Sequence, residues 1–400
     1  MTSPPAPPST TSRRRPRVVH IINSLSTGGA ETMLARLVGA AGSPQFEHVV
    51  LPLLEGGPVT ERVRAAGALA EPLKVEGARN FLTSPMRLAA RLRSLRPDVV
   101  QGWLLQGNIA ASVGTRLARL RAPVLWNVRW TLYDLESERR STRSLFRLSG
   151  RLSRQPRLII YNAQLAVSQH AAIGFPTDRA RVIPNGFDTE HFRPDPEART
   201  AVRQELGIPE DRVVVGMVAR YHAMKDHAMS LRAAAHLAER RPDVMFVYAG
   251  WHVDADNAEI TGLIDTLGLA GRVRLLGERH DVARLYASFD AYWMSSVARG
   301  VTEGFPNVIA EAMACGVPCI ATNVGDAATI IGDTGRVVDS QDWRAFADAT
   351  SELLEPGGAE SRRRGIEART RIVRDYSLDV IAAAYDDLYH EVLDDAAGRT

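Results

Sequence analysis

The sequence predicts a two-domain α/β protein in which each domain holds a parallel sheet covered by helices on both faces. Its 400 residues, 45% of them hydrophobic, are enough for two domains that each bury a core. Short apolar runs alternate with helical patterns along most of the chain, which is typical of parallel sheets. A polar stretch rich in turn residues, 185–196, separates this alternation into two series.

The expected domain boundaries follow from this separation. Residues 1–16 are rich in Pro, Ser and Thr and predict a disordered tail. We expect the first domain at residues 17–184, a linker at 185–210 and the second domain at 211–375. Residues 376–400 predict a C-terminal helix.

Each expected strand is a short run of apolar and β-branched residues, and each expected helix carries apolar residues three or four apart. The strands are expected at residues 17–23, 48–54, 98–103, 123–128, 158–161, 181–184, 213–219, 244–249, 273–276, 291–294 and 317–321. The helices are expected at residues 30–40, 58–66, 85–95, 108–120, 163–172, 226–239, 256–267, 281–288, 306–314, 342–354 and 377–393.

Two glutamates in the second series predict a ligand site. Glu303 precedes a helix that begins near Pro306, and Glu311 lies inside that helix. Pro306 suits the first helical position because its missing N–H would have no intrahelical partner. The amides of Asn307 and Val308 are then free to bind an anion such as phosphate. The two carboxylates can address different parts of one elongated ligand at the carboxyl edge of the sheet.

Arg220 and Lys225 follow the first strand of the second domain, where ligand loops lie in parallel sheets. Both are placed to neutralise the charge of an anionic ligand. The chain has only two lysines among its 49 basic residues, which indicates that a compact ammonium is required at Lys225. The alternative is an ordinary solvated pair of loop residues.

Four segments resemble the retaining GT-B glycosyltransferases, specifically glycosyltransferase family four. They are EGFPNVIAEAMACGVPCIATNVG with its Glu-x7-Glu pattern, VARYHAMKDH, IPNGFD and GGAE, which together span residues 28–325. The resemblance implies the GT-B fold, two Rossmann-like domains facing across a cleft, with the last helix crossing back to the first domain. The alternative is a plain buried αβ unit with two chance carboxylates.

The resemblance also implies roles for individual residues. Glu311 resembles the residue that accepts hydrogen bonds from the ribose hydroxyls, and Glu303 resembles the residue that addresses the transferred sugar. Arg220 and Lys225 then act on the donor diphosphate during catalysis. The other expected donor contacts are Gly304, Phe305, Asn307, Val308, the turn residues Glu278 and Arg279, and, across the cleft, Gly28 and Gly29.

The acceptor side departs from the family pattern. Family members often have a histidine after the fourth strand of the first domain, whereas residues 98–108 contain none. Gln101, Trp103 and Gln106 stand there instead. A glutamine can hydrogen-bond a sugar hydroxyl, and Trp103 either stacks on a sugar face or packs in the core.

We expect no bound metal and no other cofactor, because the resemblance is to enzymes that need none. Asp254 and Asp256 form an Asp-x-Asp string, which binds metal in another transferase fold. Here the string precedes a helix and is expected to cap it. His222 and His227 lack an evident third ligand.

Cys315 and Cys319 are the only cysteines and are expected to be small buried hydrophobes, in agreement with a reducing cytoplasm. No run of residues approaches the length of a membrane span. We expect a cytoplasmic protein, either soluble or peripheral at the inner face of the membrane.

Residues 139–157 carry seven arginines and no acid. The spacing predicts a basic amphipathic helix with a row of arginines beside a leucine face. The row is Arg140, Arg143, Arg147, Arg151 and Arg154. It is either a solvated face or a contact with anionic lipid or a diphosphate-linked acceptor. No nucleic-acid-binding module accompanies the charge, so no nucleic acid partner is expected.

Together with these observations, the resemblance implies a glycosyltransferase of hexosyl type that uses a nucleotide sugar, and retention of the anomeric configuration is implied by the resemblance alone. Its acceptor is expected to be a glycan, a lipid-linked molecule or a small molecule in the synthesis of cell-envelope polysaccharide or glycoconjugate. Two alternatives stay open. The absent acceptor-side histidine motivates a non-catalytic paralogue that binds donor as a partner subunit, and the same fold also carries sugar-nucleotide epimerases. The presence of both glutamates, Arg220 and Lys225 argues against the paralogue.

Overall fold

The structure is a computed structural model of the chain. Of the expected N-terminal tail, residues 1–13 lie outside the described residues. The structure describes residues 14–40, 45–75, 77–132, 139–297, 301–355 and 358–398, with only the backbone at 77–83, 141 and 301–303.

The first domain is built on a parallel sheet. Within the described residues its strands lie in the order β3-β2-β1-β4-β5-β7-β8. They are β1 (Arg17–Ile22), β2 (Glu47–Pro52), β3 (Leu69–Ala70), β4 (Val99–Trp103), β5 (Val124–Val128), β7 (Leu158–Tyr161) and β8 (Ala180–Val182). The helices are α1 (Gly29–Gly39), α2 (Thr60–Ala65), α3 (Gly77–Leu95), α4 (Leu104–Ala118), α5 (Arg140–Leu152) and α6 (Gln164–Ala171).

The second domain repeats this architecture, with the strand order β11-β10-β9-β12-β14-β15 in the described residues. Its strands are β9 (Val213–Val218), β10 (Val244–Ala249), β11 (Val273–Leu275), β12 (Ala291–Met294), β14 (Cys319–Thr322) and β15 (Arg336–Val338). Its helices are α7 (Pro196–Glu205), α8 (His227–Arg240), α9 (Ala258–Thr266), α10 (Val282–Ala287), α11 (Asn307–Ala314), α12 (Ala327–Ile331) and α13 (Trp343–Leu353), with the short 3-10 helices η1 (Ala223–Lys225) and η2 (Gly332–Thr334). Two parallel sheets with α/β connections confirm the predicted fold class.

Helix α12 was not predicted, and three further helices differ from the prediction. Helix α3 begins at Gly77 and runs through Pro85, where we expected it to start. Helix α7 lies inside the expected linker and packs against α10, so the polar connection ends before Pro196. Helix α14 (Ala359–Tyr376) was not predicted, because its many arginines hide a narrow buried stripe that includes Ala368 and Ile372.

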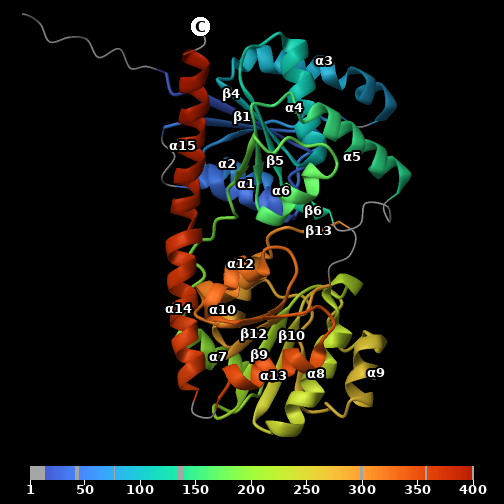
Figure 1. Cartoon of the computed structure of the whole chain (residues 1–400), viewed down its shortest axis with the longest axis vertical. Helices are drawn as coiled ribbons and strands as arrows, with labels where there is room; N and C mark the ends of the chain where they lie inside the picture. Colours follow the sequence, from blue (N-terminus) through green and yellow to red (C-terminus); the bar gives the residue numbers. More distant parts are fainter. Residues whose placement is uncertain are drawn as a thin grey trace, which may run out of the picture.

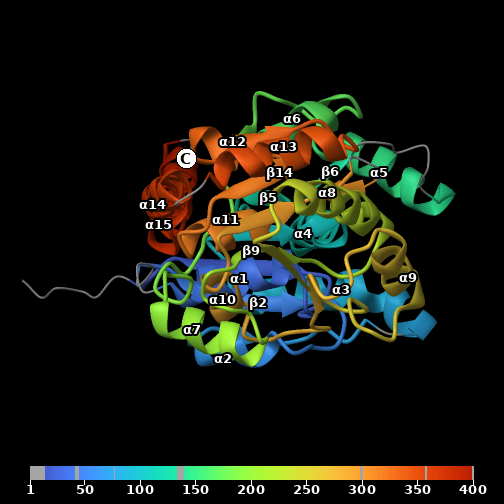
Figure 2. The ribbon, with the colours of Figure 1, turned by 90° about the horizontal axis from the view of Figure 1, so that it is seen from below.

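Helices α14 and α15 (Leu378–Ala397) run end to end along one side of both domains (Figure 1). In the view from below, α14 and α15 overlap, as expected for two helices placed end to end (Figure 2). Ile372 of α14 belongs to the core of the second domain. Tyr385 and Tyr389 of α15 are fully buried in the core of the first domain. The last helix therefore crosses back onto the first domain.

The chain passes between the domains at two neighbouring points. The backbone N–H of Phe187 donates to the carbonyl of Tyr376 at 2.9 Å, and the N–H of Leu378 donates to the carbonyl of Phe187 at 2.8 Å. A third connection is a two-stranded antiparallel sheet between the domains, made of β6 (Trp130–Leu132) and β13 (Val301–Glu303) (Figure 1).

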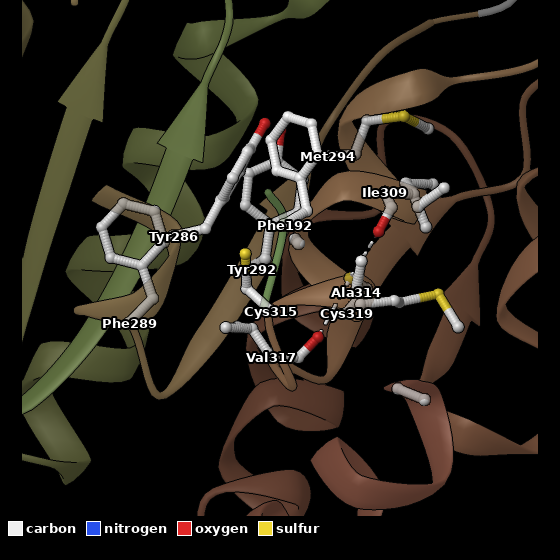
Figure 3. Close-up of a cluster of buried hydrophobic side chains, with 14 of the residues drawn as sticks. Phe192, Tyr286, Phe289, Tyr292, Met294, Ile309, Ala314, Cys315, Val317 and Cys319 are labelled. Carbon is white, nitrogen blue, oxygen red and sulfur yellow. Dashed lines mark hydrogen bonds between the residues drawn. The ribbon is translucent and has the colours of Figure 1, made fainter. Parts of the chain in front are cut away.

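The core of the second domain packs around α11 (Figure 3). Tyr286, Tyr292 and Ile309 are almost completely buried there. Cys315 and Cys319 are buried free thiols in the same cluster, and burial raises the pKa of Cys315 to about 12. Both cysteines are thus the small buried hydrophobes that the sequence predicted.

Both sheets have a point where the strand order reverses. In the first sheet it lies between β1 and β4, and in the second between β9 and β12. Loops that leave neighbouring strands in opposite directions open a crevice at the carboxyl edge, and ligands of parallel sheets bind in such crevices. The fold therefore provides one candidate ligand crevice in each domain.

Candidate active site

Helix α11 begins at the carboxyl edge of the second sheet. Its first residue is Asn307, and Pro306 is the N-cap with φ −75° and ψ 95°, so Pro306 does not occupy the expected first helical position. Its extended ψ still lets the chain enter the helix. The amides of Asn307 and Val308 lie in the first turn, where backbone N–H groups lack intrahelical acceptors. This helix start can bind an anion.

Phe305 anchors the loop before α11. The ring is buried between Phe187 and Tyr376, with centroids 6.0 Å and 5.6 Å away. These two residues stand at the points where the chain passes between domains. The loop that carries the expected sugar contacts is therefore fixed to the crossing.

Glu311 lies one turn inside α11 and meets the opposite domain. Its Oε1 is 3.7 Å from Nη2 of Arg36 on α1, and both side chains are 15% exposed. The hydroxyl of Tyr286 donates to its Oε2 at 3.4 Å. Burial lowers the pKa of Arg36, and the charge of Glu311 opposes this shift. The carboxylate expected at the ribose is thus held by a cation from the first domain.

Arg36 is in turn fixed by the crossing between domains. Its Nη1 donates to the carbonyl of Gly186 at 3.2 Å, and its guanidinium lies 5.6 Å from the centre of the Phe187 ring. The position of Glu311 is therefore coupled to the way the two domains meet.

The GGAE turn faces the start of α11 across the cleft. A Cβ on Gly29 would lie 3.5 Å from Nδ2 of Asn307. Asn185 donates to Oδ1 of the same Asn307 at 2.5 Å. A Cβ on Gly28 would lie 2.3 Å from Oε2 of Glu31, so a side chain there would require the carboxylate of Glu31 to move.

Lys225 lies beside the start of α11. It ends η1 and lines a small cavity of about 20 Å³ together with Ser296 and Pro306. Its carbonyl accepts a hydrogen bond from Oγ of Ser295 at 2.7 Å, which ties the turn to the end of β12. Arg220 lies two residues after β9 and is exposed. Lys225 thus lies beside the start of α11, whereas Arg220 lies exposed in the loop after β9.

Glu303 lies at the boundary between the domains. Its backbone ends β13 opposite Trp130 of β6. Its side chain lies outside the described part of the structure. The next residue, Gly304, is packed so closely that a Cβ would lie 3.0 Å from Oδ1 of Asn162. The sugar expected at Glu303 would meet both domains.

Asp326 joins the domains at the same place. Its backbone N–H donates to the carbonyl of Gly304 at 2.9 Å. Its carboxylate accepts from the backbone N–H groups of Gln164 at 2.8 Å and Leu165 at 3.3 Å, at the start of α6. Burial raises the pKa of Asp326, and these two hydrogen bonds oppose the shift. A carboxylate of the second domain thus caps a helix of the first.

The turn expected to contact the base carries two different side chains. Glu278 is exposed. Arg279 forms ion pairs with Asp281 at 2.8 Å and Glu205 at 2.5 Å, and these hydrogen bonds raise the pKa of Arg279. Its guanidinium is therefore engaged within the second domain, and a contact of this turn with the base stays a prediction.

Two of the three expected acceptor residues lie in the core. Gln101 and Trp103 on β4 are 0% exposed. Gln101 accepts from the Tyr389 hydroxyl at 2.5 Å, and Trp103 donates to Nδ1 of His20 at 3.1 Å. The expected acceptor contacts are wrong for both residues, because β4 turns them toward the face that α15 covers. Gln106 is exposed in the first turn of α4 and lines a cavity.

The Asp-x-Asp string does not cap α9. The cap is Asn257, whose Oδ1 accepts from the backbone of Glu259 at 3.1 Å and Ile260 at 3.4 Å. Asp254 instead accepts from the amide of Asp256 at 3.1 Å in the preceding turn. In the ranges that the structure covers, no three His, Cys, Asp or Glu side chains gather as a metal site.

Three site residues were missed in the sequence, namely Arg36, Asn162 and Asp326. Arg36 lies within a segment that has an ordinary helical pattern, and Asn162 is the residue after a short buried strand. Asp326 precedes α12 and has the sequence of a cap for that helix, whereas it caps α6 instead. Arg36 and Asp326 have partners in the other domain, and Oδ1 of Asn162 lies near Gly304 of that domain, so no local pattern identifies them.

Two family models match the chain. The model described as Glycosyltransferase Family 4 matches residues 27–191, and the one described as Glycosyl transferases group 1 matches residues 198–371. The D-inositol 3-phosphate glycosyltransferase of Corynebacterium urealyticum is 32% identical over 254 residues, 58% of either chain. That of Mycolicibacterium smegmatis is 32% identical over 232 residues, 56% of this chain and 50% of its own. The chain thus spans about half the length of these curated relatives.

Solved structures share the architecture. Anabaena Alr3699/HepE, in complex with UDP and glucose, has a TM-score of 0.77 at 22% identity, covering 94% of this chain and 99% of its own. The sucrose-phosphate synthase of Thermosynechococcus elongatus has a TM-score of 0.74 at 19% identity, with 94% and 99% covered. These likenesses confirm the predicted arrangement of two facing domains.

Proposed function

The chain belongs to the GT-B glycosyltransferases of group 1 and family 4, and from this premise we propose that it transfers a sugar from a nucleoside diphosphate to an acceptor on the first domain. One observation carries the proposal. Lys225 lines a small cavity with Pro306 at the start of α11, Glu311 lies one turn inside that helix, and Gly29 faces its first residue from the other domain. These groups offer an anion site, a carboxylate and a cation around one helix start.

The residues divide the work of transfer between them. The start of α11 and Lys225 hold the diphosphate and neutralise the charge that grows as the glycosidic bond breaks. Arg220 assists from the rim, Glu311 accepts hydrogen bonds from the ribose, and Glu303 contacts the transferred sugar. The leaving phosphate oxygen takes the proton of the acceptor hydroxyl on the same face of the sugar, so the anomeric configuration is retained. Closure of the domains excludes water that would hydrolyse the donor.

A panel of radiolabelled nucleotide sugars tests the proposal. Because Anabaena HepE was solved with UDP and glucose, UDP-hexoses come first in the panel. We expect transfer, or slow hydrolysis without acceptor, for one donor. Binding without turnover would favour a donor-binding partner subunit. Interconversion of one nucleotide sugar into another would favour an epimerase.

The charge of the diphosphate is neutralised by protein groups in this proposal, so no metal is required. EDTA is then expected to leave transfer unchanged, with the same buffer lacking EDTA as control. Loss of transfer that manganese restores would show that a metal takes part.

We also propose that the arginine row of α5 meets an anionic membrane. Arg147, Arg151 and Leu148 are exposed on this helix, and Leu148 shows 45% of its surface. In the described ranges no helix is both long and apolar enough to cross a bilayer. Each arginine near an anionic surface contributes roughly 1 kcal/mol, which salt screens.

Sedimentation with phosphatidylglycerol vesicles tests this contact. We expect binding at low salt that is lost as salt rises, and loss of binding when Arg143, Arg147 and Arg151 are changed to Glu. The matched control carries the same charge change near the end of α4, at Arg116, Arg119 and Arg121, and is expected to bind as wild type does. Equal sedimentation of all three proteins would return the arginine row to a solvated face.

A further inference from the structure

A cavity of about 450 Å³ opens in the first domain between α3, α4 and α5. Its volume lies in the range of pockets that bind small molecules. None of the residues assigned above to the donor lines this cavity, and Gln106 is the one expected site residue on its wall. Because Gln106 was expected on the acceptor side, the polarity of the cavity wall indicates which kind of acceptor could bind there.

The cavity lies at the crevice of the first sheet. Asn23 follows β1, Leu53 follows β2, and Gln106 stands in the first turn after β4, and all three line it. The strand order reverses between β1 and β4, which is where parallel sheets bind their ligands. The loop that leaves β1 continues to Gly29, which faces the start of α11. The cavity and the donor crevice thus share one connecting loop.

The wall of this cavity is mostly apolar. Leu88 of α3, Ile109 and Val113 of α4 and Leu145 of α5 contribute hydrocarbon. Among the described lining residues the polar side chains are few, and the two amides, Asn23 and Gln106, stand at the edge of the sheet. A polyol phosphate would find few partners on such a wall, because buried polar groups require hydrogen bonds.

The surroundings of the cavity indicate the rest of the ligand. Met86 of α3 and Leu148 of α5 are exposed by 64% and 45%, and each lies within three residues of a lining residue. Arg147 and Arg151 are exposed on the same helix α5, in a segment without acidic residues. Apolar walls, apolar neighbours and a basic helix suit a hydrocarbon chain that carries an anionic phosphate.

We propose that this cavity holds the hydrocarbon chain of a lipid-linked phosphate or diphosphate acceptor. The chain lies between α3, α4 and α5, and the polar end of the acceptor lies at Asn23 and Gln106, on the side of the donor crevice. This inference rests on the proposed function and narrows its acceptor to an amphiphilic anion. It predicts that affinity rises with chain length, by roughly fourfold for each methylene buried.

Calorimetry with alkyl diphosphates of increasing length tests the inference, with inorganic diphosphate as the zero-length probe. Saturating nucleoside diphosphate is present throughout, so that the donor site cannot bind the probes. We expect affinity to rise with chain length until the cavity is full. Affinity that is independent of chain length would overturn the inference.

A bulkier side chain inside the cavity should block the ligand, and the same substitution outside the cavity serves as its control. Val113→Phe is expected to weaken binding of a decyl diphosphate at least tenfold. Val373→Phe places the same substitution at a position 40% exposed on α14 and is expected to change nothing. Equal decyl diphosphate affinity in both variants would overturn the inference. The inference would also be overturned if Val113→Phe lost binding to phosphatidylglycerol vesicles but kept its affinity for decyl diphosphate.

Nucleoside diphosphate affinity and donor hydrolysis, measured on the same samples, separate the two proposals. If both are normal in wild type while chain length has no effect, the cavity assignment fails and the transferase stands. If neither is detected, the transferase itself fails. Wild-type circular dichroism and thermal unfolding in Val113→Phe, together with normal nucleoside diphosphate affinity, show that both domains of this variant are folded, so its loss of probe affinity supports the inference.

Discussion

At the residue scale, the carboxylate of Glu31 packs closely on Gly28 in the GGAE turn. Glu31 is the third residue of α1, and its carboxylate folds back over Gly28, within 2.3 Å of where a Cβ would be. A carboxylate in the first turn also complements the positive end of the helix. The turn is thus shaped by its own helix start, and this shape brings Gly29 opposite Asn307.

The two glutamates are expected to respond differently to removal. Glu311→Ala removes a charged acceptor from a poorly exposed site, so affinity for nucleoside diphosphate should fall by about 2 kcal/mol, or roughly 30-fold. Glu303→Ala should keep that affinity and slow turnover, because its expected partner is the transferred sugar. Calorimetry and donor turnover distinguish the two. Unchanged affinity in Glu311→Ala would contradict the ribose assignment.

Arg36→Met tests whether the pairing across the domains positions Glu311. Without its cation, 3.7 Å away, the carboxylate should lose orientation, and the KM for donor should rise more than kcat falls. In a double-mutant cycle, Arg36→Met should then have little further effect on nucleoside diphosphate affinity once Glu311 is Ala. Additive effects would show that the two residues act independently.

Lys225→Arg should impair turnover although it keeps the charge. Lys225 lines a cavity of only about 20 Å³ beside Pro306, and a planar guanidinium is bulkier than an ammonium. We expect kcat/KM to fall at least tenfold, or about 1.4 kcal/mol. The control is Lys74→Arg at the other lysine, which is 63% exposed and pairs with Glu55. Equal kinetics in the two variants would make Lys225 a surface charge.

The sequence places residues near helix starts and loops better than residues on a buried strand, for a physical reason. Lys225 and Glu311 stand within a few residues of strand ends and a helix start, so local pattern locates them. Gln101 and Trp103 lie on a strand, and which face of the sheet they occupy depends on α15, almost 300 residues away in the chain. The side chain of Arg36 likewise gains its role from the other domain.

At the element scale, Asp326 connects helices of different domains. Its carboxylate caps α6 and its N–H holds the loop of Gly304. Asp326→Ala should remove the cap, which is worth about 1 kcal/mol, and loosen α6 against the second domain. Asp326→Asn keeps one acceptor oxygen and avoids burying a charge, so it should be closer to wild type.

Hydrogen exchange measures this effect of Asp326. Faster exchange at Gln164 and Leu165 is expected in Asp326→Ala, with a lower rate of sugar transfer. The matched control is Asp342→Ala, which removes the cap of α13 within the second domain. Exchange at α6 that is equally fast in both variants would show that the cap between the domains contributes nothing.

Elements with a local signal were predicted, and those without one were not. The buried strands β9, β10 and β12 lie within a residue of their expected ends, because each is a continuous apolar run. Strands β6 and β13 have three residues each and exist because they pair across the domain boundary. Helix α14 was not predicted because only a narrow stripe of its residues faces the core.

At the scale of the whole molecule, the domains are joined at two adjacent chain crossings. Phe187 and Ser377 form a parallel bridge, and the hydrogen bonds of Phe187 tie the first crossing to the junction of α14 and α15. The other contacts between domains described above are those of Glu311, Gly304 and Asp326 and the pairing of β6 with β13. Opening of the cleft must break those contacts while the crossing persists, so the crossing is the expected hinge.

Gly186 tests this hinge. A Cβ there would lie 3.2 Å from Cα of Leu378 and from Cβ of Ile381, closer than packed chains tolerate without a shift. Gly186→Val should wedge the crossings apart and turn the domains away from their closed orientation. Turnover should fall about tenfold, or roughly 1.4 kcal/mol. Nucleoside diphosphate affinity should fall less, because Lys225 and the start of α11 belong to one domain.

Gly262→Val is the control, since no atom lies within 4 Å of a Cβ there. Small-angle scattering that is identical for both variants and wild type, together with normal turnover, would place the hinge elsewhere.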